Sequence, residues 1–160
     1  MGTVCIVMNV RNKALTQYHN FNYDSLCAWK GSFLLGNSQG IYEIGEQYSD
    51  DAGAEIKAFA SFVALDLGVS ARKRIRSAEL SYLSEGEMVI SWQGDERDLT
   101  SQQILPEVDD GTFQTLQIPG DRSVEGTYLT FTLANANGAG FTLNRLQVVP
   151  QVMQIGKSRR

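Results

Sequence analysis

Apolar and polar residues alternate along most of the chain, and this period of two predicts β-strands. In residues 3–10, the apolar side chains at every second position share one face. Residues 13–18 are expected to return as a second strand. Residues 26–44 hold two or three short apolar segments separated by turns, where glycine and asparagine supply the positive φ angles of tight hairpins. We therefore predict an N-terminal β-hairpin and blade-like segment over residues 1–45.

A polar, loop-like stretch over residues 45–54 is predicted to separate this segment from a larger one. The apolar residues 56–67 fit either a strand or a buried helix, and the strands expected on both sides favour a strand. Residues 94–110 are polar and are expected to loop outward, whereas residues 112–118 are predicted to form a further strand. Residues 54–153 are together predicted to form one β-sandwich.

Two hairpins are predicted within this sandwich. The first joins residues 75–83 to residues 88–92, and the second joins residues 128–133 to residues 141–149 through the turn NANGAG. The apolar phase of the last strand shifts along its length, which predicts a β-bulge near Asn144 and Arg145. The sequence thus predicts an all-β protein, a β-sandwich with an N-terminal β-hairpin extension. The predicted core residues are Met88, Ile90, Trp92, Leu129, Phe131, Leu133, Phe141 and Leu143.

Charge limits the classes of partner. The chain has 160 residues with 18 acidic and 14 basic side chains, and this balance disfavours a direct reader of nucleic acid, which needs a basic surface. No apolar run approaches the roughly 20 residues that cross a bilayer, and the first eight residues lack a signal-peptide pattern. We therefore expect no membrane span, and a protein that is either made and kept in a cytoplasm or assembled into a particle there.

The sequence offers little catalytic material. His19 is the only histidine, so a Ser-His-Asp, Cys-His or multi-histidine metal site is excluded or incomplete. Cys5 and Cys27 match no metal or redox spacing, and reduced thiols are favoured over a disulfide. We predict a protein without enzymatic activity, cofactor or required metal.

Pairs of carboxylates recur in the predicted turns. A glycosidase needs only two carboxylates, but solvated turn residues are the commoner outcome and are favoured here. A calcium site at an aspartate pair is the weaker alternative, because no EF-hand spacing is present. The pairs are Asp50 with Asp51, Glu85 with Glu87, Asp95 with Glu96, and Asp109 with Asp110.

Basic residues cluster in a predicted turn and in the C-terminal tail, residues 154–160. The members are Arg72, Lys73, Arg74, Arg76, Arg159 and Arg160. One interpretation is a solvated turn and a frayed end; the other is a set of contacts with an acidic neighbouring subunit. On the second interpretation, changing Lys73 and Arg74 to Glu slows assembly without unfolding the subunit.

Four aromatic residues in predicted strands have two interpretations. Core packing is the commoner fate of such side chains, and an exposed platform that stacks on sugar rings is the other. The residues are Trp29, Tyr42, Trp92 and Tyr128. The second interpretation gives the alternative function of a glycan- or receptor-binding β-sandwich module.

Several segments together resemble small virion structural proteins of tailed bacteriophages. Residues 21–44 resemble the opening segment of those proteins, which is itself similar to part of a propeller blade. LGVSARKRIR, residues 67–76, resembles a glycine step followed by a basic strand, and residues 126–149 resemble their closing hairpin. The terminal residues 158–160 are also similar, whereas Thr127 stands where the family often has arginine.

This resemblance implies a non-enzymatic virion component of the tail, neck or tail tip. It implies a symmetric ring whose partners are copies of the chain and other virion tail or neck proteins. The protein would then be assembled in the host cytoplasm and remain in the virion. The basic residues of the two clusters would lie at the subunit contacts.

Overall fold

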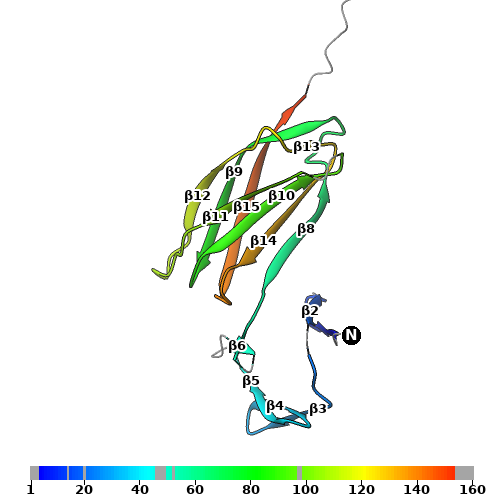
Figure 1. The fold of residues 1–160 in the computed structure, drawn as a ribbon, viewed down its shortest axis with the longest axis vertical. Coiled ribbons are helices and arrows are strands. Elements are labelled where there is room, and N and C mark those ends of the chain that lie inside the picture. Colours follow the sequence, from blue (N-terminus) through cyan, green and yellow to red (C-terminus); the bar gives the residue numbers. More distant parts are fainter. Residues whose placement is uncertain are drawn as a thin grey trace, which may run out of the picture. The chain divides into compact units, whose positions relative to one another are not determined.

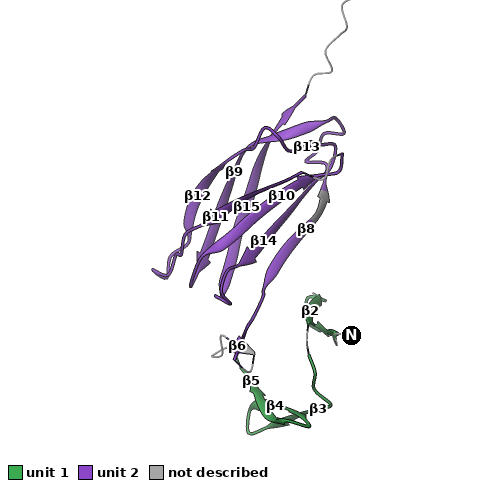
Figure 2. Ribbon diagram, in the orientation of Figure 1, with its two compact units in different colours: residues 1–48 green, residues 49–160 purple. Residues whose placement is uncertain are grey.

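The computed structural model describes residues 4–13, 15–19, 21–45, 50–51, 53–96 and 99–153. It is all-β, as the alternation predicts, and over these residues it contains no helix. None of the described residues therefore belongs to a helix that is long and apolar enough to cross a membrane. The chain divides into two compact units, residues 1–48 and residues 49–160 (Figure 2).

The first unit is built from two small antiparallel sheets. One is the hairpin of β1 and β2, and the other is a meander in which β4 lies between β3 and β5. Lys30 and Gly31, at the turn between β3 and β4, both have positive φ, which matches the mirror-image turns that suit strand twist. The strands are β1 (Val4–Met8), β2 (Leu15–His19), β3 (Ser25–Trp29), β4 (Ser32–Asn37) and β5 (Gly40–Ile44).

The second unit is a sandwich of two antiparallel sheets, preceded by a two-stranded ribbon (Figure 1). One sheet has the order β11-β10-β14-β8. In the other sheet, β15 runs along one edge of β9, while β12 and β13 pair with successive parts of its other edge. The ribbon is β6 (Asp50–Asp51) and β7 (Ala54–Glu55). The sandwich strands are β8 (Phe59–Leu65), β9 (Lys73–Ser84), β10 (Met88–Gly94), β11 (Thr100–Leu105), β12 (Gln114–Pro119), β13 (Glu125–Gly126), β14 (Leu129–Asn135) and β15 (Phe141–Val152).

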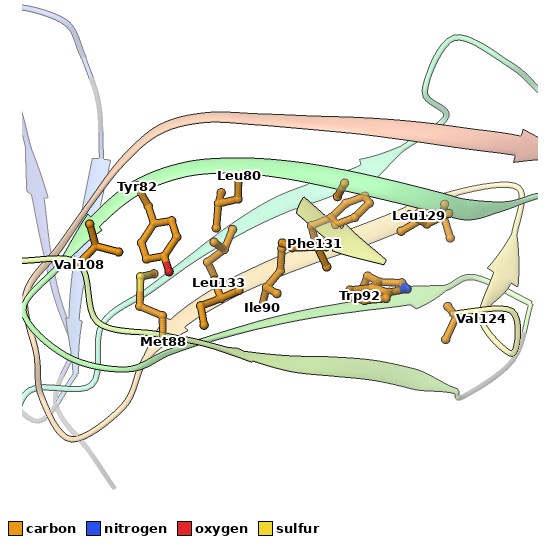
Figure 3. Packing of buried hydrophobic residues seen from close by; sticks show 14 residues of the cluster. Leu80, Tyr82, Met88, Ile90, Trp92, Val108, Val124, Leu129, Phe131 and Leu133 are labelled. Carbon is orange, nitrogen blue, oxygen red and sulfur yellow. The ribbon is translucent and has the colours of Figure 1, made fainter. Parts of the chain in front are cut away.

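The core lies between the two sheets of the sandwich. Alternate residues of β10 and β14 point inward and are buried against side chains from β9, as Figure 3 shows. Six of the predicted core residues are buried, and the other two, Phe141 and Leu143, are partly buried and pack against the same cluster. The strand phase read from the sequence is therefore confirmed. The six are Met88, Ile90, Trp92, Leu129, Phe131 and Leu133.

Both predicted hairpins of the sandwich are wrong in their pairing. β9 and β10 lie in different sheets, so the turn at residues 84–87 carries the chain across the sandwich. Ser84 forms a β-bridge with Val108 instead. The Val108 amide donates to the Ser84 carbonyl at 2.9 Å, and the Ser84 amide donates to the Val108 carbonyl at 3.0 Å. β14 and β15 likewise lie in different sheets, because β14 pairs with β10 and β8. Alternation reveals which face of a strand is buried, but it does not identify the partner strand.

The predicted bulge is confirmed, although it lies opposite a different strand from the one expected. The register of β15 against β9 shifts between Leu143 and Arg145. Residues 56–67, which fitted either a helix or a strand, contain β8. Residues 94–110 do not form only an outward loop, because they contain β11 and the buried side chains of Leu105 and Val108.

Asn135 fixes the path by which the chain enters the sandwich. Its side-chain nitrogen donates to the carbonyls of Ile56 and Ala139 at 2.9 Å each. Its side-chain oxygen accepts from the amide of Ala58 at 2.9 Å, and its own amide donates to the Ala58 carbonyl at 3.0 Å. This Asn135 clamp holds the residues before β8 against the turn that follows β14.

Candidate functional site

The basic segment is a strand start rather than the turn that the sequence predicts. β9 begins at Lys73, so this lysine, Arg74 and Arg76 are strand residues. Lys73 is fully buried, and its ammonium donates a hydrogen bond to the carbonyl oxygen of Thr127. The side chain of Lys73 is therefore part of the interior of the unit and is not displayed on its surface.

Arg72 is held by two carboxylates of the same unit. Its Nε lies 2.9 Å from Glu96 Oε2, and its Nη2 forms an ion pair with Glu125. Close by, Asp95 Oδ1 accepts hydrogen bonds from the amides of Thr127 and Tyr128 at 2.8 and 3.1 Å. These contacts join the residues that follow β10, in one sheet, to β13 and its neighbours in the other.

Glycine is required where these two segments meet. A Cβ atom built on Gly94 would lie 2.2 Å from the carbonyl oxygen of Glu125. A Cβ atom on Gly126 would lie 2.5 Å from Asp95 Oδ1. The two backbones therefore approach more closely than any residue with a side chain allows, and the polar cluster around Arg72 is a structural fastening between the sheets.

Of the predicted interface residues that the structure describes, Arg74 and Arg76 are the ones that are neither fully buried nor held in an ion pair with another described residue. Arg74 is half-buried, and its Nε donates to Gln151 Oε1 at 3.1 Å. Arg76 is exposed and forms no ion pair with any described residue. Arg159 and Arg160 lie outside the described residues. The contact of these four arginines with a neighbouring subunit stays a prediction.

Two aspartates of the predicted carboxylate pairs accept local hydrogen bonds. Asp110 Oδ1 accepts from the amide and the hydroxyl of Thr112 at 2.9 and 2.8 Å, and Asp50 Oδ1 accepts from the amide of Gly53 at 2.9 Å. The hydrogen bonds from Thr112, followed by one from Gln114, lower the pKa of Asp110. Within the described ranges, no three histidine, cysteine or acidic side chains gather in a metal-binding arrangement.

The thiols and the histidine belong to the first unit. Cys5 is half-buried and Cys27 is exposed, and both are free thiols rather than a disulfide. His19 Nε2 lies 3.2 Å from Gln17 Nε2, on the exposed strand β2.

The four aromatic residues do not line one platform within either unit. Trp92 belongs to the sandwich core, where its side chain is 3% exposed. Trp29 lies opposite Ser32 and Tyr42 lies opposite Leu35, and these register positions place the two aromatics on opposite faces of the β3–β5 sheet. Tyr128 is exposed in the second unit.

The feature that sequence reasoning missed is the exposure of the first unit. Among the described residues, 12 of the 21 exposed large apolar side chains fall within residues 1–48. The alternation predicts the strands of this unit. Apolar residues on both faces of a strand are typical of a strand that is covered on both sides, but the sequence pattern does not show whether another layer covers each face. The twelve are Val4, Ile6, Val7, Met8, Val10, Leu15, Tyr18, Leu26, Trp29, Phe33, Ile41 and Ile44.

The register divides the β3–β5 sheet into two faces, which we name after the central residue of each. The Leu35 face consists of Leu26, Ala28, Phe33, Leu35, Asn37, Gly40, Tyr42 and Ile44. The Leu34 face has Cys27, Trp29, Leu34 and Ile41 together with Ser25, Ser32, Gly36 and Glu43. Leu35 itself is 3% exposed, but Phe33 beside it is 55% exposed, and Ile41 on the other face is 79% exposed.

The fold and these surfaces define an all-β protein in which a well-packed sandwich carries a small, apolar β-unit. No family model matches the chain, and no curated protein matches its sequence.

Proposed function

We propose that the chain is a non-enzymatic structural subunit of a tailed-phage virion. In this proposal it assembles as a symmetric ring in the tail, neck or tail tip, with copies of itself and with other virion proteins. It is made and assembled in the host cytoplasm.

The observation that carries the assembly role is the exposed apolar surface of the first unit. Soluble monomers rarely expose contiguous apolar patches larger than a few hundred Å², and larger ones mark interaction sites. Phe33 and Ile41 alone place strongly exposed apolar groups on opposite faces of one three-stranded sheet. A sheet of this size gains stability by packing against another layer, so the unit favours a protein that works in contact with partners.

The polar part of the sandwich supports a structural role. Its most elaborate polar cluster pairs Arg72 with Glu96 and Glu125, and buries the Lys73 ammonium against a carbonyl. These groups stabilise one another and fasten the two sheets. The virion part of the proposal is supported by the resemblance of residues 21–44, 67–76 and 126–149 to small phage tail proteins.

A ring requires a heterologous contact, in which one surface of each subunit meets a different surface of the next. We assign the charged part of this contact to Arg74, Arg76, Arg159 and Arg160, facing an acidic surface of the neighbour. The net charge of −4 of the chain favours an acidic surface on a neighbouring copy. Rim charges of this kind act mainly on association rate and salt sensitivity.

The test is the copy number of the full chain in purified virions, measured by quantitative mass spectrometry. We expect the chain in a fixed small multiple that matches a ring. Its absence from washed particles would overturn the proposal. So would a monomer that binds a glycan and can be deleted without loss of particle integrity, since that result supports a recognition module.

A further inference from the structure

We infer that Asn137 is a site of spontaneous deamidation, and that its isoaspartate product loosens the turn to which the Asn135 clamp is bonded. The reaction needs water and no enzyme. Its chemistry belongs to the turn of residues 135–140 itself, so it is independent of the proposed assembly.

The sequence places a reactive pair at the tip of this turn. Of the eight asparagines in the chain, Asn137 is the one that is followed by glycine. In deamidation, the backbone nitrogen of the following residue attacks the asparagine side chain, and glycine allows this close approach because it has no Cβ atom. Every other asparagine is followed by a residue whose side chain crowds the attacking nitrogen.

The structure leaves both reacting groups accessible. Asn137 is exposed, and φ is 57° at Asn137 and 76° at Gly138, as expected for a mirror-image turn with these two residues at its centre. The Ala139 amide closes the turn by donating to the Ala136 carbonyl at 3.3 Å. Among the described residues, none forms a hydrogen bond with the Asn137 side chain or with the Gly138 amide, so no such bond has to break before they react.

Asn37 is the comparison within the same chain, because it also lies at a tight turn. Its Oδ1 accepts from two backbone amides of that turn at 2.9 and 3.1 Å, and its Nδ2 donates to the Asn22 carbonyl at 3.0 Å. It is followed by Ser38 rather than by glycine. The hydrogen bonds and the side chain of Ser38 both oppose ring closure, so we expect Asn37 to persist while Asn137 reacts.

Asp110 and Gly111 form the one other pair in the described turns that is able to close the same ring, but this pair starts from an acid. An ionised carboxylate resists attack, because it is already negatively charged and its oxygen leaves poorly. Hydrogen bonds from Thr112, followed by one from Gln114, lower the pKa of Asp110 and keep it in that form. Asn137 is therefore the position at which this chemistry is fastest.

The reaction passes through a five-membered succinimide ring. The Gly138 amide nitrogen gives its proton to solvent and attacks Asn137 Cγ, and the bond from Cγ to the side-chain nitrogen breaks, so that ammonia leaves. Water then opens the ring. Attack of water at Cγ gives aspartate, whereas attack at the main-chain carbonyl gives isoaspartate, in which the chain continues through Cβ and Cγ. One amide and one water become one carboxylate and one ammonium ion, and nothing is oxidised or reduced.

Isoaspartate lengthens the main chain of the turn by one carbon atom. The turn has little room for this change, because hydrogen bonds hold both of its sides. The Ala136 amide donates to the Glu87 carbonyl at 2.9 Å, and Asn135 Nδ2 donates to the Ala139 carbonyl at 2.9 Å. The second of these bonds belongs to the Asn135 clamp, so a longer turn pulls directly on the clamp.

The product also adds a negative charge beside acidic neighbours. The turn at residues 84–87 lies next to this turn, since the Glu85 amide donates to the Gly140 carbonyl at 3.0 Å. The Glu85 carboxylate lies against Gly140, so close that a Cβ atom there would be 3.0 Å from Glu85 Oε2. A further negative charge adds repulsion between two turns that hydrogen bonds hold together. Both changes therefore weaken the clamp at the entry to β8.

Peptide mapping by mass spectrometry tests the site on the folded full chain, incubated in mildly alkaline buffer. We expect a mixture of aspartate and isoaspartate at residue 137. It should form at least about tenfold faster than any deamidation of Asn37 in the same sample, which corresponds to a barrier lower by about 1.4 kcal/mol. Equal persistence of Asn137 and Asn37 would overturn the inference. Aspartate alone would indicate direct hydrolysis without the ring and would overturn it as well.

Hydrogen exchange tests the consequence for the clamp. The isoaspartate form carries an extra negative charge and can be separated by ion exchange. The Ala58 amide donates to Asn135 Oδ1 at 2.9 Å, and we expect it to exchange at least about tenfold faster in the isoaspartate form than in the unreacted chain. The amide of Leu80, a fully buried residue of β9, should exchange equally slowly in both forms.

An Asn137→Gln chain incubated in the same way is the matched control. Glutamine keeps the amide but would have to close a larger ring, so we expect neither a change of mass nor faster exchange at Ala58. Unchanged exchange at Ala58 in the isoaspartate form would overturn the link between the turn and the clamp. Equal acceleration at Ala58 and Leu80 would overturn it too, because that result indicates unfolding of the whole sandwich rather than a local loosening.

Discussion

The buried ammonium of Lys73 donates a hydrogen bond to the carbonyl oxygen of Thr127, so the first residue of β9 is tied to the segment between β13 and β14. This contact changes what a substitution at Lys73 reports. A glutamate there would bury an uncompensated negative charge against a carbonyl oxygen, so Lys73→Glu tests folding. Charged assembly contacts are therefore tested by substitutions at Arg74 and Arg76.

We expect Lys73→Glu to lower the free energy of unfolding by about 3–5 kcal/mol, the usual cost of a buried charge without a partner. Arg76→Glu, at an exposed position of the same strand, should change it by no more than about 0.5 kcal/mol. Urea unfolding of the full chain measures both. Equal, small effects of the two substitutions would show that Lys73 is not enclosed.

Phe131 is fully buried at the centre of the sandwich and faces Trp92 across the β10–β14 ladder. Phe131→Ala removes most of a large apolar side chain and leaves a cavity, so we expect a loss of about 3–5 kcal/mol in the free energy of unfolding. Ile104→Ala, at an exposed position of β11, is the control and should cost less than about 1 kcal/mol. A loss below about 1 kcal/mol for Phe131→Ala would contradict its place in the core.

Gly120 has no room for a side chain, because a Cβ atom there would lie 1.9 Å from the carbonyl oxygen of Ile75. Gly120→Ala must displace backbone, and we expect it to destabilise the sandwich by about 3 kcal/mol or more, at or above the usual range for overpacking. Gly111→Ala is the comparison, since that site is open and only its φ of 74° disfavours alanine, at about 1–2 kcal/mol. The order of the two thermal midpoints is the measurement, and a less stable Gly111→Ala variant would refute the close approach.

Acid should weaken the sandwich through two turn carboxylates. Hydrogen bonds from Thr112 lower the pKa of Asp110, and hydrogen bonds from Ser123, followed by one from Ser101, lower the pKa of Asp121. A carboxyl whose pKa is lower in the folded state stabilises the fold above its ordinary pKa. That contribution is lost as pH falls from about 4 through the folded-state pKa.

The double variant Asp110→Asn, Asp121→Asn should therefore show a shallower loss of thermal midpoint than the unaltered chain between about pH 5 and about pH 2. Asp109→Asn, in the same loop as Asp110, controls for the removal of one negative charge. Parallel curves for the double variant and the unaltered chain would mean that these hydrogen bonds add nothing to stability.

The sequence predicts the faces of strands well because burial acts on every second residue. Met88, Ile90 and Trp92 are buried as their spacing requires, and the shift of phase in β15 marks a real bulge near Arg145. The pairing of strands is not encoded in this way. The turns after β9 and β14 contain the residues of hairpin turns, yet each leads to the opposite sheet, because the partner of a strand is decided by contacts far along the chain.

The burial of Lys73 and the strand β11 could not be predicted from the sequence for a similar reason. A lysine between two arginines is typical of a solvated segment, and only the position of Thr127 in space shows that Lys73 is enclosed. The sequence pattern does not reveal β11, because only the last of its six residues, Leu105, is buried. Its position at the edge of the sheet leaves Ile104 exposed. Local composition describes such strands poorly, since their pairing with a neighbour rather than their burial holds them in place.

The Asn135 clamp has a mechanical consequence. Any pull that reaches the sandwich from the first unit arrives through Ile56 and Ala58, directly at the three hydrogen bonds that join these residues to Asn135. β8 is an edge strand, and an edge strand loaded from its end yields by peeling, one hydrogen bond after another. The clamp stands before the first of those bonds, so the force that the sandwich withstands before β8 detaches is set by one asparagine.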